Sequence, residues 1–558
     1  MFAVFQSQDL CYDPRSTLNF IPVRAQPETV ARNLENSDPQ FQGGSLFSFL
    51  SVAHEEVDLL SNTLERDPLQ RSESVELMHL TREQIVSAYV DILGSQRVIT
   101  DEQTLKENSV DRYYKVESIF GIYSLPLPAA VVKPSTPLEV SEVLKFANEH
   151  GINVVPKTGG SATEGGLETV IENSIVVDGS TMNKIIAIDV ENMQATVQCG
   201  VILEDLENEL RKIGYTTGHS PQSKPLAQYG GLVATRSIGQ FSTLYGGIED
   251  MLVGVETVFP NGRICRIKNV PRRAAGPDIR HLVLGNEGTL NFITEVTVKI
   301  FRYYAKNNKF YGYLLDDMET GFKILREVIT EGYRPSVARL YDREDGLYHF
   351  KHFSGGHCVL IFMAEGPKLI ADATGAAIEQ IVSSFDSAVR VEDKLIEDWF
   401  NNLNWDVSKI EDERVEIRDT LINGFTTEIS GNWSVINDIY TNALARIRSE
   451  VSADFSMLGG HSSHSYLNGT NLYFVYYYKV DVDPTEERTT YHDPIQNIIV
   501  EETLKLGGSM CHHHGVGKHR THFLAQEYGS SLYMLETLKF AFDPNGIMNR
   551  GTIFPLKK

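Results

Sequence analysis

Residues 137–150 carry the clearest helical pattern in the chain. Thr136 can cap this segment, Pro137 occupies its first position, and Glu139 has the spacing that completes a capping box. Apolar side chains then recur every three or four residues, at Val140, Val143, Leu144 and Ala147. The pattern predicts an amphipathic helix that ends at Gly151 and turns one face toward a core.

Strand and helix patterns alternate along the rest of the chain in two styles. Between residues 128 and 220, short apolar runs such as INVVP and NSIVVDG alternate with amphipathic segments, which indicates a small α/β unit. Beyond residue 300 the strands are longer, as in HCVLIFMAEG and TNLYFVYYYKV, and so are the helices. We predict an α+β fold with domains over 79–305 and 306–490, a C-terminal segment over 491–558, and an extension of unknown role over 1–78.

The charge balance narrows the choice of partners. The 558 residues include 51 Lys and Arg against 74 Asp and Glu, a net charge of −23. Nucleic acids and anionic membranes attract basic surfaces, so neither is expected as the main partner. The five cysteines form no CxxC pair, which argues against a disulfide framework or a cysteine zinc site and fits a reducing compartment.

No apolar run approaches the ~20 residues that a membrane-spanning helix needs. The first ten residues, MFAVFQSQDL, lack the basic and long apolar regions of a signal peptide. We therefore expect a cytoplasmic protein without a membrane span.

A glycine-rich loop, PKTGGSATEGGL (residues 156–167), follows the strand INVVP directly. Successive backbone N–H groups in such a loop form a concave nest that suits a pyrophosphate, although an ordinary surface turn has the same composition. The chain contains no GxGxxG, GxxxxGK[ST], GxSxG or HExxH motif. The loop is therefore not part of a Rossmann or P-loop nucleotide site, and the α/β-hydrolase elbow and the common metalloprotease site are also excluded.

Two further glycine and hydroxyl segments follow, AQYGGLVATRSIGQFSTLYG and GPDIRHLVLGNEGTLNFITEVTVKI. With the loop after INVVP, they resemble the FAD-binding domain of the vanillyl-alcohol-oxidase/PCMH superfamily. GYTTGHSP, YGGIEDMLVG and CHHHGVGK are also similar to alkyldihydroxyacetonephosphate synthase and to bacterial FAD-linked oxidoreductases related to it, whereas the tail FDPNGIMNRGTIFP resembles D-lactate and glycolate dehydrogenases. The resemblance implies a two-subdomain PCMH-type FAD-binding domain over 79–305, an α+β cap (substrate) domain over 306–490, and a C-terminal segment that packs back on the FAD domain.

The resemblance also implies which residues hold the FAD. They are Lys157, Thr158, Gly159, Gly160, Ser161, Ala162 and Thr163 in the first stretch; Gln222, Ser223, Lys224, Pro225, Leu226, Ala227, Gln228, Thr235, Arg236, Ser237 and Ile238 in the second; and Glu287, Gly288, Thr289, Leu290, Asn291, Phe292 and Ile293 in the third. Asn291 and Phe292 replace the family's usual Gly and Val. The first loop has no His or Cys, the residues through which some relatives attach FAD, so we expect non-covalent FAD.

Histidines gather near the C-terminus. Eight of the 16 fall between residues 461 and 522: His461, His464, His492, His512, His513, His514, His519 and His522. Three consecutive histidines are hard to explain by core packing, because neighbouring side chains of an extended chain point in opposite directions. Imidazole suits metal binding, acid–base catalysis or simple exposure to solvent, and the pattern leaves all three open.

The family resemblance separates these options. Metal-dependent hydroxyacid dehydrogenases of the superfamily resemble GHxGDGNLH followed by GEHGIG, whereas here SHSYLNGTNLYF and HHHGVG put Tyr473 and His513 in place of a His and the Glu. The resemblance therefore implies no catalytic metal and gives proton transfer to Tyr473, His512, His513 and His514. His461, His464 and His512 could still trap zinc.

Two more residues follow from the resemblance. Arg339, in RPSVARLYD, matches the arginine of the family's PASIRLxD, and a guanidinium near a flavin would hold a carboxylate or phosphate. An ion pair with Asp342 or Asp345 is the alternative for Arg339. His219, in TGHSP, matches TGHEP and is expected near the flavin.

We therefore predict an FAD-dependent dehydrogenase that transfers hydride from a small hydroxylated anion, such as a hydroxy acid, sugar acid or sugar phosphate, to flavin N5. The electron acceptor stays unidentified, and a homodimer is one option for the assembly. The first alternative is a redox-neutral transferase similar to alkyldihydroxyacetonephosphate synthase. A flavin-free metal-dependent hydrolase is a more remote alternative.

Overall fold

The computed structural model describes residues 80–112, 116–402 and 408–556. The predicted extension over residues 1–78 lies outside these residues. Among the described residues, no helix is both long and apolar enough to cross a membrane.

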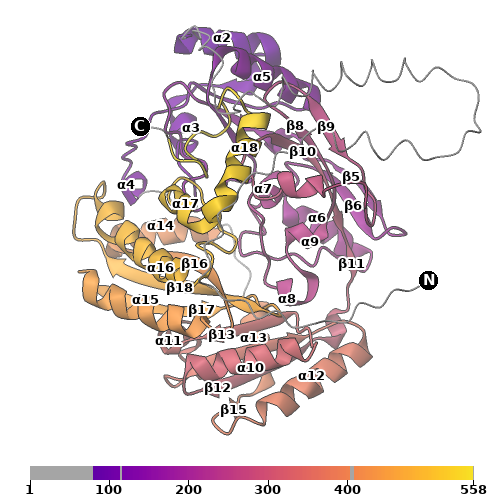
Figure 1. The fold of residues 1–558 in the computed structure, drawn as a ribbon, viewed down its shortest axis with the longest axis vertical. Helices are drawn as coiled ribbons and strands as arrows, with labels where there is room; N and C mark the ends of the chain where they lie inside the picture. Colours follow the sequence, from indigo (N-terminus) through magenta and orange to yellow (C-terminus); the bar gives the residue numbers. More distant parts are fainter. Residues whose placement is uncertain (1–79, 113–115, 403–407, 557–558) are drawn as a thin grey trace, which may run out of the picture. The chain divides into compact units, whose positions relative to one another are not determined.

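The first part of the fold contains two sheets (Figure 1). The smaller has the order β1 (Val98–Ile99), β2 (Ala130–Val132), β4 (Ile175–Asp178), β3 (Val154–Lys157), and its last three strands are parallel. The larger is antiparallel, with the order β5 (Ile185–Asp189), β6 (Gln194–Gln198), β10 (Phe292–Lys299), β8 (Leu252–Val258), β9 (Ile264–Ile267). The parallel strands are buried on both faces, which is why INVVP and SIVVD read as continuous apolar runs.

The helices and short strands of this part are α2 (Arg82–Leu93), α3 (Glu102–Glu107), α4 (Val116–Ile119), α5 (Pro137–His150), α6 (Leu203–Lys212), β7 (Tyr215–Thr216), α7 (Tyr229–Ala234), α8 (Ser242–Tyr245), α9 (Ile248–Met251) and β11 (Phe301–Arg302). Helix α5 starts after Thr136 and ends at Gly151, as predicted. Its capping box does not form, because the Glu139 carboxylate accepts the amide of Ser135 at 2.7 Å and pairs with Arg97. Only the Thr136 half of the box is present.

The second part is built on one seven-stranded antiparallel sheet. Its order is β15 (Val389–Arg390), β12 (Lys309–Leu315), β14 (Cys358–Ala364), β13 (Val337–Tyr341), β17 (Phe455–Ser462), β18 (Gly469–Lys479), β16 (Ile422–Asn432). One face packs on α10 (Met318–Thr330), α12 (Lys368–Val382), α15 (Ile436–Glu450) and α16 (Asp493–Lys505). On the other face, α11 (Arg343–Phe350) and α13 (Asp393–Asn401) cover β12, β13 and β14, and α14 (Ser408–Thr420) lies near β16.

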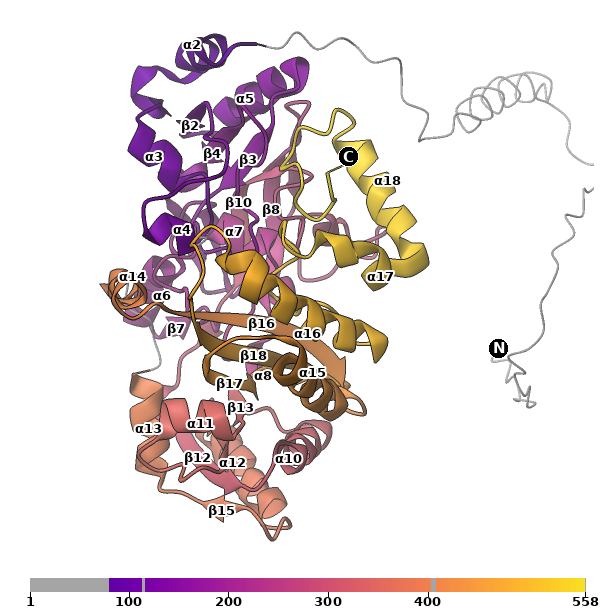
Figure 2. The same cartoon turned by 90° about the vertical axis from the view of Figure 1, so that its left-hand side faces the viewer.

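The chain then returns to its first part through α17 (Leu524–Tyr528) and α18 (Leu532–Phe542), drawn in yellow in Figure 2. Val154 of β3 donates its amide to Ile547 at 2.8 Å, and Met548 forms a parallel bridge beside it. This return carries residues 511–519, which we call the histidine loop, to the edge of the cavity described below. The predicted α+β fold class is confirmed.

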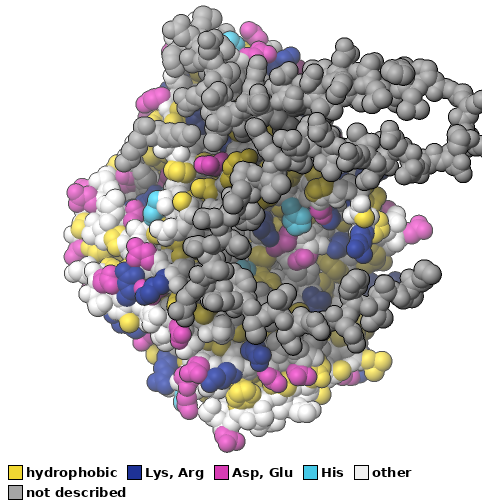
Figure 3. Space-filling view, in the orientation of Figure 1, with side chains coloured by type: hydrophobic (Ala, Val, Ile, Leu, Met, Phe, Trp, Pro, Cys, Tyr) yellow, Lys and Arg dark blue, Asp and Glu magenta, His cyan; other side chains and the backbone are white. Residues whose placement is uncertain are grey.

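Over the lower part of the face drawn in Figure 3, where α10 and α12 lie in Figure 1, basic and acidic side chains lie side by side.

Candidate active site

A cavity of about 670 Å³ is lined by the glycine-rich loop, by the segments around residues 222–238 and 287–293, by strands β13, β16, β17 and β18, and by the histidine loop. This is a typical volume for a cofactor or substrate site. We call the wall made by residues 156–167, 221–238 and 287–293 the loop wall, and the wall made by the second sheet and the histidine loop the sheet wall.

The loop wall depends on close backbone approach. A side chain at Gly159 would meet the Leu226 carbonyl oxygen at 2.5 Å and the Gln228 amide at 2.7 Å, so only glycine fits there. Gly160 has a φ of +67°, which also favours glycine. The two glycines therefore fold the loop tightly against residues 226–228 and leave its backbone groups facing the cavity.

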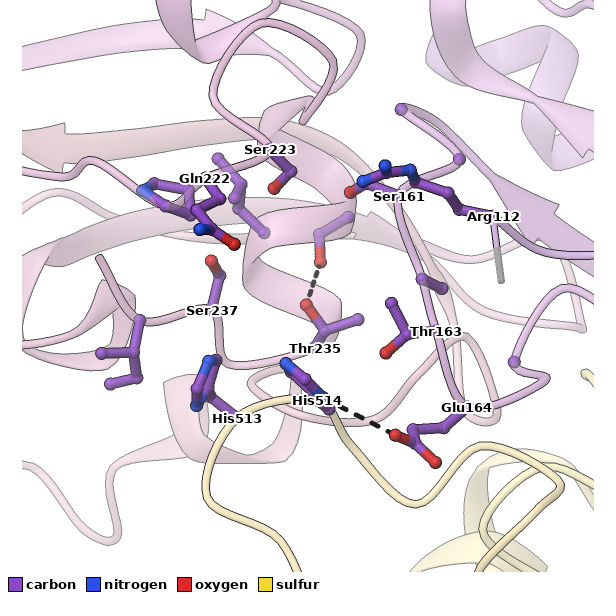
Figure 4. Close-up of a pocket in the computed structure, with 18 of the residues that line it drawn as sticks. Arg112, Ser161, Thr163, Glu164, Gln222, Ser223, Thr235, Ser237, His513 and His514 are labelled. Atoms are coloured by element: carbon purple, nitrogen blue, oxygen red, sulfur yellow. Dashed lines mark hydrogen bonds and ion pairs between the residues drawn. The ribbon is translucent and has the colours of Figure 1, made fainter. Parts of the chain in front are cut away.

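Most of the residues predicted to hold FAD line this cavity. They are Lys157, Thr158, Gly159, Gly160, Ser161, Ala162, Thr163, Gln222, Ser223, Gln228, Thr235, Ser237, Ile238, Glu287, Gly288, Asn291, Phe292 and Ile293. Figure 4 shows Gln222, Ser223 and Ser161 facing His513 and His514 across the open space.

Seven of the predicted residues do not line it: Lys224, Pro225, Leu226, Ala227, Arg236, Thr289 and Leu290. Arg236 has a φ of +52°, its side chain is 52% exposed, and it pairs with Glu249 at 3.4 Å. Residues 224–227 lie behind the glycine-rich loop, and the Thr289 carbonyl accepts a bond from Lys539. Contact between these seven residues and bound FAD stays a prediction.

Two observations test whether the loop wall suits a flavin nucleotide. Its nest is kept free of side chains by Gly159, as shown above. In addition, Gln228 Oε1 and Gln240 Nε2 are buried at the cavity without a hydrogen-bond partner among the described residues, and buried polar atoms seldom stay unpaired. A polar ligand that both donates and accepts hydrogen bonds would satisfy them, so these residues fit FAD.

The sheet wall contains a cross-strand row of aromatic rings. Tyr341, His461 and Tyr473 lie opposite one another on β13, β17 and β18, with successive ring centroids 4.9 and 4.8 Å apart. The next residue in the row, Glu428 on β16, is paired with Tyr473. The Tyr473 hydroxyl lies 2.6 Å from His513 Nε2.

Arg339 lies on the same sheet face and lines the cavity. It is 6% exposed, and its Nε has no hydrogen-bond partner among the described residues. The ion pair with Asp342 or Asp345 does not form. Asp345 instead contacts His461 at 2.6 Å, and Arg339 Nη2 donates to the other nitrogen of His461 at 3.5 Å.

Two buried carboxylates hold the histidine loop. Glu428 accepts the amides of His512, His513 and His514, the last at 2.7 Å. Glu287 accepts the amides of Val516 and Gly517, each at 2.8 Å. Burial raises the pKa of Glu287 to about 7. Because both ends of the loop are anchored in this way, its three imidazoles have fixed positions.

The three loop histidines differ in position. His513 and His514 line the cavity, and His514 Nδ1 lies 3.6 Å from Glu164, whereas His512 lies behind them. Burial lowers the pKa of His512 to about 3 and that of His513 well below its usual range. Both imidazoles are therefore neutral at pH 7, and each has one N–H donor and one acceptor nitrogen.

His219 does not line the cavity. It lies behind Ser237, with its Nε2 3.2 Å from the Ser237 hydroxyl, and burial lowers its pKa to about 4. Any influence of His219 on a ligand therefore passes through Ser237.

Glu428, His512 and His513 place ligand-type atoms within 4.8 Å of one another. The Glu428 carboxylate already accepts three amides and lies 3.7 Å from the Arg520 guanidinium. Its lone pairs are therefore committed to the loop, and the expectation of no catalytic metal stays a prediction.

Sequence reasoning missed several residues that support the site. Glu428, Arg520 and Tyr466 are brought there by strand pairing and by the return of the chain. Glu428 gave one usable signal, since a lone carboxylate inside the strand sequence FTTEIS is unusual when buried. Arg520 and Tyr466 carry no comparable local signature. Glu164, inside the glycine-rich loop, and Asp345 were in view, but their contacts with Arg520 and His461 were not predicted.

Two family models match the chain. A FAD binding domain model covers residues 128–268, and the C-terminal domain model of FAD linked oxidases covers residues 305–553. The uncharacterized FAD-linked oxidoreductase YgcU of Escherichia coli (strain K12) is 64% identical over 484 residues, which are 86% of this chain and 100% of YgcU. The chain belongs to the FAD-linked oxidoreductases of the PCMH/vanillyl-alcohol-oxidase superfamily.

Other FAD-linked enzymes are similar at lower identity. Alkyldihydroxyacetonephosphate synthase of Dictyostelium discoideum is 27% identical over 77% of this chain and 74% of its own. A solved structure of an alkyldihydroxyacetonephosphate synthase shares the fold, with a TM-score of 0.66 and 22% identity over 87% of this chain and 86% of that one. Glycolate oxidase subunit GlcD of Bacillus subtilis (strain 168) is 27% identical over 77% of this chain and 89% of GlcD.

These comparisons confirm the predicted family of FAD-linked oxidoreductases, its PCMH-type FAD-binding domain with a second α+β domain, and FAD as the cofactor. Non-covalent attachment of the FAD stays a prediction, as do the domain boundaries and the individual site residues.

Proposed function

We propose that this FAD-linked oxidoreductase is a dehydrogenase that oxidises a CH–OH group of a small hydroxylated anion, such as a hydroxy acid, sugar acid or sugar phosphate. One observation carries the proposal. The Arg339 guanidinium is buried in the cavity wall without a carboxylate partner among the described residues, and the same cavity contains the hydrogen-bonded pair Tyr473 and His513.

Arg339 would bind the anionic group. A buried guanidinium that pairs with no carboxylate of the chain is costly, and an anionic ligand removes that cost. Its planar fork suits a carboxylate or phosphate. His461 restricts the orientation of Arg339, because Asp345 accepts the proton on His461 Nδ1 and thereby leaves His461 Nε2 as an acceptor for Arg339.

Tyr473 and His513 would remove the hydroxyl proton. Tyr473 faces the cavity and can take the proton of the substrate hydroxyl while its own phenolic proton moves to His513 Nε2, 2.6 Å away. General-base assistance of this kind contributes about 10²–10⁴ in rate. FAD, when bound by the loop wall, supplies the hydride acceptor, flavin N5.

A redox-neutral transferase similar to alkyldihydroxyacetonephosphate synthase is the second candidate. The triple histidine and Tyr473 favour it, because the resemblance to that enzyme runs through these residues. The same proton-transfer groups would serve either reaction, so the substrate decides between them.

Anaerobic titration of the purified holoenzyme tests the proposal. We expect the visible flavin band to bleach with at least one of glycolate, D-lactate, L-lactate, gluconate or glycerol 3-phosphate, and to persist with ethylene glycol, the uncharged counterpart of glycolate. Bleaching by acyl-dihydroxyacetone phosphate with release of fatty acid, and by none of the other compounds, would favour the transferase. No bleaching by any of them would refute both candidates.

A further inference from the structure

Four side chains form an unbroken line of hydrogen bonds that leads from Tyr473 away from the cavity. The Tyr473 hydroxyl lies 2.6 Å from His513 Nε2, and His513 Nδ1 lies 2.8 Å from His512 Nδ1. His512 Nε2 lies 2.7 Å from the Tyr466 hydroxyl. Tyr473 and His513 line the cavity, whereas His512 and Tyr466 do not.

The chemistry of the four groups allows every bond to point the same way. A neutral imidazole has one N–H donor and one acceptor nitrogen, and a phenol both donates and accepts. Tyr473 can therefore donate to His513, His513 to His512 through the two Nδ1 atoms, and His512 to Tyr466. After one proton has moved along each bond, the same line is intact with every donor reversed.

The outer end of the line reaches partly exposed groups. Tyr466 is half-buried, and burial together with the negative charge of Glu249 raises its pKa. Glu249 Oε2 has no hydrogen-bond partner among the described residues, and burial raises the pKa of this carboxyl group. Its other oxygen pairs at 3.4 Å with Arg236, whose side chain is 52% exposed.

A proton that reaches His513, at the inner end of the line, needs a path out of the cavity. A proton that stayed on His513 would sit beside the imidazoles of His514 and His464, whose ring centroids are 4.8 and 5.3 Å away, and Arg520 adds positive charge nearby. Charge confined among these groups would oppose removal of a second proton. Glu428 is the facing carboxylate, but it already accepts the amides of the histidine loop.

We propose that Tyr473, His513, His512 and Tyr466 form a proton relay that carries the proton of the substrate hydroxyl out of the cavity toward solvent. The relay rests on the proposed dehydrogenase function. The hydroxyl proton moves to Tyr473, the phenolic proton of Tyr473 to His513 Nε2, the Nδ1 proton of His513 to His512, the Nε2 proton of His512 to Tyr466, and the phenolic proton of Tyr466 to water. One proton enters, one leaves, and no residue of the relay is oxidised or reduced.

The first test needs no substrate. In holoenzyme labelled with ¹⁵N-histidine, Tyr466→Phe removes the outermost acceptor, which we expect to shift the nitrogen resonances of both His512 and His513. Of these two histidines, His512 hydrogen-bonds to Tyr466 and His513 does not, so a shift at His513 reports coupling through the line. His512→Gln and His513→Gln assign the resonances. Tyr533→Phe, at a tyrosine that is 63% exposed on α18, is the matched control and should shift neither. Unchanged His513 resonances in Tyr466→Phe would overturn the relay.

The second test follows proton release during anaerobic flavin reduction in weak buffer with a pH indicator. The probe is glycolate or D-lactate, whichever bleaches the wild-type flavin. Wild type should release its proton together with bleaching. In Tyr466→Phe and His512→Gln release should lag bleaching, and bleaching itself should slow about tenfold, less than loss of the base itself would cause. Added imidazole should partly restore His512→Gln. Synchronous release in both variants would overturn the relay, whereas failure of wild type to bleach would refute the proposed function and leave the ¹⁵N measurement to decide the relay.

Discussion

The loop wall presents backbone amides and small hydroxyl side chains to the cavity, whereas the sheet wall presents imidazole, phenol and guanidinium groups. The residues of the loop wall come in short runs that each build one turn. The contacts of the sheet wall join distant positions, since Tyr473 and His513 are 40 residues apart and Glu287 and Val516 are 229 apart. One wall therefore has the composition of a cofactor cradle, and the other has the groups that move protons and bind charge.

Tyr473→Phe should show the largest difference between the two walls, because it should slow flavin reduction without changing FAD content. The variant loses the hydroxyl that faces both the cavity and His513, so the rate constant of anaerobic flavin reduction should fall by about 10²–10⁴. FAD content should stay at the wild-type level, because Tyr473 belongs to the sheet wall. Tyr477→Phe, which removes a hydroxyl from the same strand face, is the control. An equal loss in both variants would contradict a special role for Tyr473.

The difference between the walls also explains which parts of the site could be predicted from the sequence. The strand, loop and helix around residues 128–167 follow local rules. The glycines marked one candidate nest, and the resemblance across three segments identified it as part of an FAD site. Arg236 shows the limit even there: a local φ of +52° goes with a side chain that faces solvent, although its neighbours Thr235 and Ser237 line the cavity.

The sheet wall could be predicted only in part. Tyr473 and the three histidines were found by resemblance, but their partners depend on strand register. Glu428 faces Tyr473 because β16 pairs with β18 in one particular register, and a shift by one residue would turn that carboxylate to the opposite face. Tyr466 and Asp345 belong to the site only through the positions of His512 and His461.

Glu428→Gln should destabilise the sheet wall without changing a residue of the loop wall. The amide cannot replace a carboxylate that accepts three backbone N–H groups beside Arg520, so unfolding in denaturant should become easier by about 3 kcal/mol. Glu450→Gln, which breaks the exposed pair with Arg446, is the control and should change stability far less. Similar losses in the two variants would show that Glu428 does not hold the loop.

Glu287→Gln should change stability in a pH-dependent way. Burial raises the pKa of Glu287 from 4.5 to about 7, so the folded protein binds this proton more tightly than the unfolded chain does. The contribution of Glu287 to stability is therefore full below about pH 4.5 and declines as the pH rises through 7.

Glutamine does not titrate. The stability of wild type minus that of Glu287→Gln should therefore fall by up to about 3 kcal/mol between pH 4.5 and pH 8, as measured by denaturant unfolding across that range. All other ionisable groups are common to both proteins and cancel in the difference. A difference that stays constant with pH would mean that Glu287 is ionised throughout.

Gly159→Ala should weaken FAD binding by the loop wall and leave the sheet wall intact. The added methyl group would meet backbone atoms of residues 226–228 at 2.5 to 2.7 Å, and relieving such a clash costs about 1–3 kcal/mol. FAD should bind roughly 10- to 100-fold more weakly, as measured by titration of the apoprotein. Gly166→Ala, whose methyl group would have its nearest neighbour at 3.8 Å, should lose less affinity. Equal losses would mean that close backbone approach at Gly159 is unimportant.

His219→Asn should have the smallest effect, although the residue is a histidine close to the loop wall. His219 contacts the cavity only through Ser237, and its pKa of about 4 keeps it neutral between pH 5 and 9. Loss of one neutral hydrogen bond costs about 0.5–1.5 kcal/mol, so flavin reduction should slow by roughly tenfold at most. The pH profile of the rate should keep its shape, because no titrating group has been removed from that range. A hundredfold loss or an altered profile would instead place His219 in the chemistry and make the loop wall more than a cradle.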